Sequence, residues 1–328
     1  MLRRSLVVLS ALAAAAGPAR AEPPVFTVAM GRAAVAAGDY AAAESILTPL
    51  AARRDPEARL ALGALHLEER LPLSDPAEGR LMILLAATAG LPAAQARYGE
   101  MLRTGEHTLR DPKMAAEWCA EAALAGDAQG ALCLGRLRRD GAGKPRDAAE
   151  AVRWFAVAAE AGAPEAHVAL GEMLAAGVGA PRNLRAAREH FLLAAGRGDA
   201  QAQFRLGEMA RDGRAAPADP ADARRWFEKA AISGHQAARR ALALGLAETG
   251  RALEDVTRAY AWANLAAAAG DPEMAALRDR LGARLDHEGL AEAEALSTRF
   301  ARGEFGAPSA PADPSRPVYA LVSAGWGG

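Results

Sequence analysis

The sequence predicts an all-α protein in which helical hairpins stack side by side into a solenoid. Hydrophobic residues make up 51% of the chain but aromatic residues only 5%, and alanine supplies the excess, which favours helices over sheets. Glycine, tryptophan and paired-alanine positions return every 36 residues along the 328-residue chain. Each such repeat contains two helix-like stretches separated by glycine- and proline-containing stop signals. No single hairpin can bury its apolar stripes alone, so the repeats are expected to stack.

Charge, cysteine count and the lengths of the apolar runs argue against several classes of protein. The chain carries 39 basic and 40 acidic residues, which disfavours a surface built to coat nucleic acid. Two cysteines are too few for a disulfide-framework mini-protein. No segment after residue 21 has the roughly eighteen uninterrupted apolar residues of a membrane helix. We therefore expect no nucleic-acid partner and no membrane span in the mature chain.

Residues 1–21 have the pattern of a removable export signal. Arg3 and Arg4 supply a positive start, residues 6–16 an apolar run, and Ala19-Arg20-Ala21 a cleavage site of the small-x-small type. An uncleaved membrane anchor is the alternative, but the run is short for a bilayer core about 30 Å thick. The sequence predicts cleavage after Ala21 and a periplasmic or secreted protein.

Four columns define the repeat. A glycine preceded by Leu or Tyr recurs at Gly63, Gly99, Gly135, Gly171 and Gly207. A bulky residue follows nineteen positions later, at Met82, Trp118, Trp154, His190, Trp226 and Trp262. An Ala-Ala pair and a closing glycine complete each repeat, as in Ala158-Ala159 and Gly162. A glycine inside a helix costs about 1 kcal/mol relative to alanine. Its recurrence predicts that a neighbouring backbone or ring packs against it, most simply the tryptophan column.

The flanking segments are expected to cap the array. A shorter hairpin with a turn at Gly38-Asp39-Tyr40 precedes the repeats, and two helices follow Asp271-Pro272. Pro, Ala, Ser and Gly dominate the last residues. The expected organisation is a cleaved signal peptide at 1–21, an N-terminal capping hairpin at 22–57, six repeats at 58–274, C-terminal capping helices at 275–305 and a disordered tail at 306–328.

At these columns the chain resembles the Sel1-like repeat family, a relative of the tetratricopeptide repeat. Segments such as LGEMLAAGVG and AVRWFAVAAEAG carry the resemblance, and RAYAWANLAAAAGD resembles the terminal repeat of exported bacterial members. The sixth repeat departs, with Ala243 where the glycine is expected. The resemblance implies a right-handed α-solenoid that acts as a protein-interaction scaffold or a regulator of envelope signalling.

No pattern of catalytic or cofactor-binding residues emerges from the sequence. Gly141-Ala142-Gly143-Lys144 looks like part of a phosphate loop, but Arg138 and Pro145 stand where glycine and Ser or Thr are required. The next repeat has a similar Gly-Val-Gly at this point, which indicates an inter-helix turn. The histidines lie at different repeat phases, and His190 is expected to be a packed ring rather than a ligand. We expect a protein that is not an enzyme and holds no cofactor or metal.

Cys119 and Cys133 are candidates for a disulfide. They lie seven residues either side of Gly126, so they have similar heights on neighbouring antiparallel helices. However, Cys119 shares its repeat position with large apolar residues such as Phe155, which are expected in the core. Cys133 shares its repeat position with arginines, so the two side chains could face different directions. Both the bridged and the free state remain open on these grounds.

The family resemblance also bears on the cysteines and suggests an alternative function. Cysteine-rich secreted members that bind β-lactams carry a disulfide between comparable helices, though nearer Ala122 and Ala131 of this chain. The alternative is therefore a binder of β-lactams or cell-wall ligands, or a weak hydrolase of them.

A partner is expected on the first helix of each hairpin, which lines the concave surface in tetratricopeptide-like arrays. Counting from the Leu-Gly glycine, positions −2, +1 and +5 share one helix face away from the apolar stripe. An ordinary solvated helix face is the alternative. The candidate residues for binding another protein or a peptide are Arg97, Glu100, Arg136, Glu172, Arg205 and Glu208.

Overall fold

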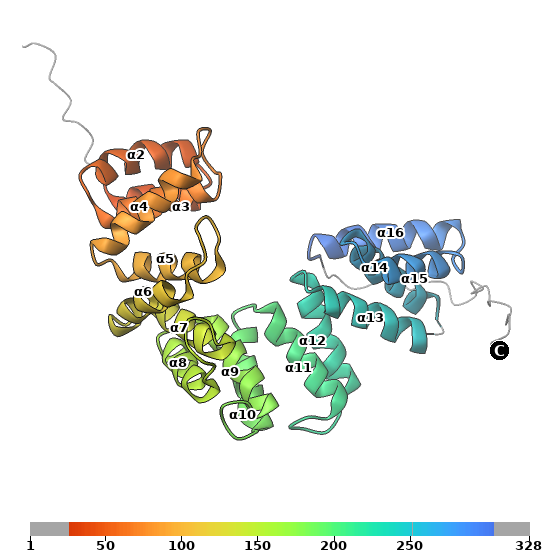
Figure 1. The fold of residues 1–328 in the computed structure, drawn as a ribbon. Coiled ribbons are helices and arrows are strands. Elements are labelled where there is room, and N and C mark those ends of the chain that lie inside the picture. The colour runs from red at the N-terminus through yellow and green to blue at the C-terminus, as the bar shows by residue number, and fades with distance from the viewer. Residues whose placement is uncertain (1–25, 251, 305–328) are drawn as a thin grey trace, which may run out of the picture. The chain divides into compact units, whose positions relative to one another are not determined.

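The computed structural model describes residues 26–250 and 252–304, and these ranges form sixteen α-helices and no strand (Figure 1). The helices pair into hairpins, which confirms the predicted all-helical repeat fold. The expected signal peptide at 1–21 and the expected tail at 306–328 lie outside the described residues. Contacts divide the chain into an N-terminal unit, residues 1–94, and a C-terminal unit, residues 95–328.

The N-terminal unit holds two hairpins around one core. Its helices are α1 (Val28–Ala36), α2 (Tyr40–Ala52), α3 (Pro56–Leu67) and α4 (Pro76–Thr88), and each packs against the next. Leu47 and Leu62 are buried at the centre of the cluster formed by α2 and α3. The turn between α1 and α2 uses Gly38 at φ +75°, and the Asp39 side chain accepts a hydrogen bond from the Ala42 N–H. The segment expected to cap the array therefore forms a complete helical hairpin.

The C-terminal unit continues the hairpins from α5 onward. Its helices are α5 (Pro92–Thr104), which begins just before the division, α6 (Pro112–Leu124), α7 (Ala128–Asp140), α8 (Ala148–Glu160), α9 (Pro164–Ala176), α10 (Leu184–Ala195), α11 (Ala200–Asp212), α12 (Pro220–Ile232), α13 (Gln236–Thr249), α14 (Leu253–Ala268), α15 (Pro272–Gly282) and α16 (His287–Ala301). From α6 to α15 each helix packs against the next, while α16 folds back onto α14. We call α5, α7, α9, α11 and α13 the first helices, and α6, α8, α10, α12 and α14 the second helices.

Caps set the repeat length. Asp147 and Asp219, which precede α8 and α12, accept hydrogen bonds from backbone N–H groups of the first turn, and Asn183 does the same for α10. Each such cap contributes about 1 kcal/mol. Gly177 and Gly213 end α9 and α11 in the left-handed conformation, which glycine adopts without steric cost. Fixed start and stop residues therefore give the hairpins equal length.

The glycine column packs against a ring, but the ring is not tryptophan. A methyl group added at Gly135, Gly171 or Gly207 would come within 2.5–2.6 Å of the ring of Phe155, Phe191 or Phe227 respectively. These phenylalanines follow the tryptophan column by one residue and are buried, whereas Trp154 and Trp226 are half-buried. One residue turns a helix by about 100°, so the predicted tryptophan contact is wrong by one position.

Two glycines in first helices should respond oppositely to alanine. Gly207→Ala places a methyl group 2.6 Å from Phe227, so overpacking should outweigh the helix-propensity gain and lower the unfolding free energy by about 1 kcal/mol. Gly245 has nothing within 4 Å of an added methyl group, so Gly245→Ala should raise it by about 1 kcal/mol. Urea unfolding followed by circular dichroism measures both. Changes of the same sign in the two variants would contradict the packing described here.

Candidate interaction surface

All six predicted partner-binding residues lie on first helices of the C-terminal unit. Arg97 and Glu100 are on α5, Arg136 on α7, Glu172 on α9, and Arg205 and Glu208 on α11. All six are half-buried. The structure brings five of them into two ion-pair clusters, one joining α5 to α7 and the other joining α9 to α11. Arg97 takes part in neither cluster.

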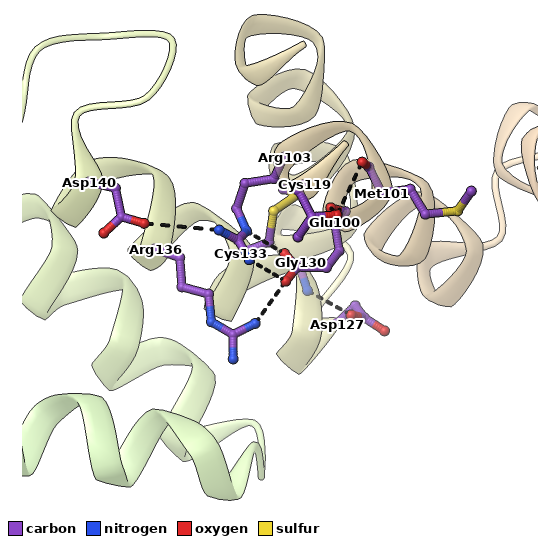
Figure 2. Close-up of a disulfide and its surroundings, with 10 residues drawn as sticks. Glu100, Met101, Arg103, Cys119, Asp127, Gly130, Cys133, Arg136 and Asp140 are labelled. Atoms are coloured by element: carbon purple, nitrogen blue, oxygen red, sulfur yellow. Dashed lines mark hydrogen bonds and ion pairs between the residues drawn. A yellow bond between two sulfur atoms is a disulfide. The ribbon is translucent and has the colours of Figure 1, made fainter. Parts of the chain in front are cut away.

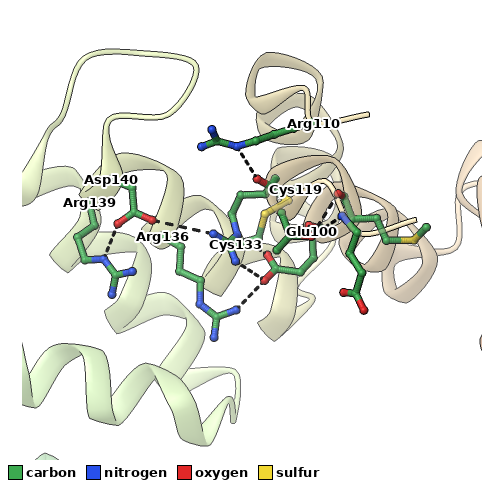
Figure 3. Close-up of polar contacts among 11 residues, drawn as sticks. Glu100, Arg110, Cys119, Cys133, Arg136, Arg139 and Asp140 are labelled. Carbon is green, nitrogen blue, oxygen red and sulfur yellow. Dashed lines mark hydrogen bonds and ion pairs between the residues drawn. A yellow bond between two sulfur atoms is a disulfide. The ribbon is translucent and has the colours of Figure 1, made fainter. Parts of the chain in front are cut away.

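The first cluster is centred on Glu100. Its carboxylate accepts hydrogen bonds from Arg103 of the same helix at 2.7 Å and from Arg136 of α7 at 3.0 Å (Figure 2). Arg103 also lies 4.0 Å from Asp140, and Asp140 accepts a hydrogen bond from Arg139 at 2.8 Å (Figure 3). One carboxylate therefore joins two consecutive first helices.

Two arginines set the charge state of Glu100. Burial acts to raise the pKa of this carboxyl, but the hydrogen bonds and positive charges of Arg103 and Arg136 together outweigh burial and leave the pKa below its ordinary value. The carboxylate is therefore held ionised as the pH falls.

A second cluster lies two hairpins later, with Glu172 at the repeat position of Glu100 but with different partners. Glu172 accepts hydrogen bonds from Arg205 at 2.9 Å and from Gln201 at 3.2 Å, both on α11. Arg205 also donates to Glu208 at 2.9 Å. Burial acts to lower the pKa of Arg205, but its bonds to Glu208 and Glu172 leave the pKa above the ordinary value. Gln201 extends the cluster to His235, before α13, at 2.9 Å.

Two hollows adjoin the second cluster, and a larger one lies one repeat further along the chain. One of about 240 Å³ lies among α9, α10 and α11, where Leu184, Phe191 and Met209 provide apolar surface beside Glu172 and Arg205. A larger one of about 540 Å³ lies at the corresponding place among α11, α12 and α13. We call these two hollows the inter-repeat slots. A third, of about 200 Å³, lies between α7 and α9 and separates the two clusters.

Cys119 of α6 and Cys133 of α7 are joined by a disulfide, with Cα atoms 6.0 Å apart (Figure 2). Both residues are buried. Gly130 brings the helices close, since a methyl group there would lie 2.6 Å from the Ala122 methyl. Cys133 therefore faces α6, although the same repeat position holds Arg97 in α5 and Arg205 in α11. Position −2 of the predicted polar stripe falls on Cys133 in α7 and on Ala169 in α9, and both residues are buried, so the stripe is interrupted there.

The glycine-rich turn and the histidine singled out in the sequence both pack as parts of the fold. Gly143 adopts φ +78° in the turn before α8, and a methyl group there would lie 2.7 Å from the Pro112 carbonyl oxygen, so the glycine serves a close-packed turn. His190 packs beside His167 with Nδ1 atoms 3.1 Å apart, and burial leads the causes that lower the pKa of both rings. Among the described residues, no group of three or more His, Cys, Asp or Glu side chains could hold a metal ion. No helix in the described ranges is long and apolar enough to cross a membrane.

The predicted set leaves out several polar residues of the clusters, among them Arg103, Gln201 and His235. Arg103 lies three residues after Glu100, and Gln201 lies four residues before Arg205, so both share a helix face with a predicted residue. That spacing is a usable signal. His235 reaches Gln201 across 34 residues of sequence, and only the stacking of the repeats brings the two together.

Comparison with known proteins points to one family. A model described as the Sel1 repeat matches residues 92–127, 128–162, 164–199, 200–235 and 237–271, together more than half of the chain. The family model finds five repeats where six were expected, because it does not match residues 58–91, which hold most of α3 and all of α4. A search of curated proteins finds no significant match.

Two solved structures are similar over most of the chain. A Sel1 repeat protein from Oxalobacter formigenes is 25% identical with a TM-score of 0.63, over 83% of this chain and 99% of that one. The protective antigen c5321 of uropathogenic Escherichia coli, which displays an SLR fold, is 27% identical with a TM-score of 0.58, over 84% of this chain and 60% of that one.

The Glu100 cluster predicts a pH dependence of stability. Because the folded pKa is lowered, the contribution of Glu100 is present above the unfolded pKa of about 4.3 and is lost as the pH falls through the lower folded pKa. Glu100→Gln should therefore reduce the unfolding free energy at neutral pH and flatten its fall below about pH 4.3. Urea unfolding across that range measures this, with Glu248→Gln on an exposed part of α13 as the control. Parallel curves for Glu100→Gln and the wild type would count against the cluster.

Proposed function

Because the chain belongs to the Sel1 repeat family, we propose that it is a non-catalytic scaffold that binds a segment of another protein along its first helices. The inter-repeat slots are the observation on which the proposal depends. They combine apolar surface with charged borders at the same place in two consecutive repeats. Extended repeat arrays characteristically use such repeated surfaces to hold peptides or proteins.

The slots differ in size for an identifiable reason. Met209 borders the smaller slot, and Gly245 occupies the same repeat position at the larger one. Likewise Arg205 borders the smaller slot, and Ala241 occupies the same repeat position at the larger one. Loss of both long side chains matches the increase from about 240 to about 540 Å³.

The chemistry of the larger slot defines its occupant. Phe227, Leu242 and Leu246 provide apolar surface, and Arg211 and Arg224 are the charged residues at its border. Burying a large apolar side chain in such a hollow contributes roughly 1.5–3 kcal/mol. The expected ligand is a peptide segment with a large apolar side chain next to an acidic residue.

The polar clusters suit binding rather than catalysis. Their charged groups pair with one another, as Glu100 does with Arg136, and both cysteines are held in the disulfide. Neither cysteine lines the inter-repeat slots. We therefore do not propose that the slots bind β-lactams. No cofactor is proposed.

Filling the larger slot tests the proposal. Gly245→Met installs the residue of the preceding repeat at an exposed helical position with open space around it, so folding should be retained while the slot is occupied. Peptides selected from a random display library on the purified chain should bind Gly245→Met at least about tenfold more weakly in calorimetry. Val157→Met, at an exposed position of α8, is the control.

Two outcomes would contradict the scaffold proposal. One is a selection that enriches no peptide on the folded chain. The other is a set of selected peptides that bind Gly245→Met as tightly as the wild type.

We further propose that the chain is exported and cleaved after Ala21. The pattern of residues 1–21 and the disulfide support this, because disulfides persist in oxidising compartments. When the full chain is expressed in a bacterium, mass spectrometry of the periplasmic fraction should find Glu22 as the first residue and no free thiol. Arg3→Glu with Arg4→Glu should reduce export. A cytoplasmic chain that retains Met1 would refute the proposal.

A further inference from the structure

A hollow beside the second helices α6 and α8 and the first helix α7 is built differently from the inter-repeat slots. It has a volume of about 480 Å³ and lies among α6, α7, the turn after α7, and α8. Ala116, Ala120 and Leu134 give it an apolar part, and Trp154 adds an aromatic one. We call it the lysine hollow, because two lysines line it. It shares no lining residue with the slots of the proposed function.

The lysine hollow gathers most of the lysines of the chain. Only Lys113, Lys144 and Lys229 occur in the whole sequence, and the first two line this one hollow. Lys113 comes from the first turn of α6, and Lys144 comes from the turn that leads to α8. Because the chain has only one other lysine, this hollow concentrates two of its three ammonium groups.

A buried arginine completes the cationic set. Arg138 lines the hollow and is 7% exposed, and its Nε lies 2.8 Å from the Glu150 carboxylate. Its Nη1 is buried with no hydrogen-bond partner. A buried donor left in this state destabilises the fold. Glu150 also accepts a hydrogen bond from the Trp154 indole N–H at 3.2 Å, so its carboxylate has both an ion-pair partner and a hydrogen-bond donor.

Neighbouring repeats show that the fold does not need these charges. At the positions of Lys113, Arg138, Lys144 and Glu150, the next repeat has Ala149, Leu174, Ala180 and Ala186. The preceding repeat has Ala77, Leu102, Thr108 and Met114. Replacing a buried ion pair by apolar residues is often neutral or stabilising. The helices of this repeat therefore carry a charged set that stacking alone would not select.

We propose that the lysine hollow binds a carboxylate attached to a compact apolar body. The ammonium groups of Lys113 and Lys144 hold the carboxylate, and the buried guanidinium of Arg138 adds a third positive charge to the wall of the hollow. The apolar body lies against Leu134 and the Trp154 ring. Three cations and the carboxylates of Glu117 and Glu150 leave the lining one positive charge in excess, which matches a monoanion better than a phosphate dianion. Either a free organic acid or the carboxyl group of a peptide supplies this chemistry.

Calorimetric titration of the purified chain tests the chemistry and its source. Phenylacetate and N-acetyl-Ala-Phe with a free carboxyl terminus are the probes, and phenylacetamide and the amidated peptide are their uncharged counterparts. At least one carboxylate should bind saturably, and at least about tenfold more tightly than its amide. The tighter of the two carboxylates identifies the source. Phenyl phosphate should bind more weakly than phenylacetate.

Variants assign the binding to this hollow. The double variant Lys113→Ala with Lys144→Ala places alanine at both positions, as in the next repeat. It should weaken binding at least about tenfold. Lys229→Ala is the matched control, because the third lysine lies on α12 against Trp226. Arg138→Leu with Glu150→Met reproduces the preceding repeat, and should unfold like the wild type in urea while losing the ligand.

Several results would overturn the proposal. Amides that bind as well as the carboxylates would remove the role of charge. Equal weakening by Lys229→Ala would show attraction to the general surface rather than to the hollow. Tighter binding of phenyl phosphate, or no saturable binding of either carboxylate, would also refute it. None of these results bears on the slots among α9 to α13, so the two proposals fail separately.

Discussion

The close approach of first and second helices within each repeat is the constraint on which the fold depends. Gly135, Gly171 and Gly207 leave room for the phenylalanine ring of the partner helix, and a single added methyl group would overlap that ring. The glycine weakens its own helix, but without it the phenylalanine ring would have no space. Because it involves only residues of one hairpin, it can be repeated without change. Stacking then buries the alanine-rich faces between hairpins.

The disulfide stands at this same contact. Cys119 occupies the phenylalanine column and faces Gly99 as Phe155 faces Gly135. Its smaller side chain leaves less apolar surface for burial, and the covalent bond to Cys133 joins α6 to α7 in its place. A cross-link that closes so short a loop contributes about 3 kcal/mol in the chain-entropy account. One repeat of the array therefore replaces a packed ring with a bond between consecutive hairpins.

Sequence periodicity predicted the helical hairpins because it reports contacts within one repeat. The caps at Asp147 and Asn183, the stops at Gly177 and Gly213, and the burial of the phenylalanine column all recur at fixed spacing. The charged residues of the first helices were also found from their helical phase. Their pairing was not, because the bonds from Glu100 to Arg136 and from Glu172 to Arg205 join different hairpins. Helical phase alone also does not predict that Cys133 is buried. Arg97 has the same repeat position but is half-buried.

Departures from the repeat show the positions at which stacking alone does not decide the residue. A residue that every repeat needs is explained by stacking, as the glycine and phenylalanine columns are. Gly245 and Arg138 have no such explanation, since one leaves a helix face open and the other buries a charge where both neighbouring repeats place leucine. Each exception weakens local structure by about 1 kcal/mol or more, through helix propensity in one case and an unpaired donor in the other. A repeat array tolerates such losses because the neighbouring hairpins hold the weakened one in place. Comparing each position with its counterparts 36 residues away therefore separates residues that stacking requires from residues that a ligand would require.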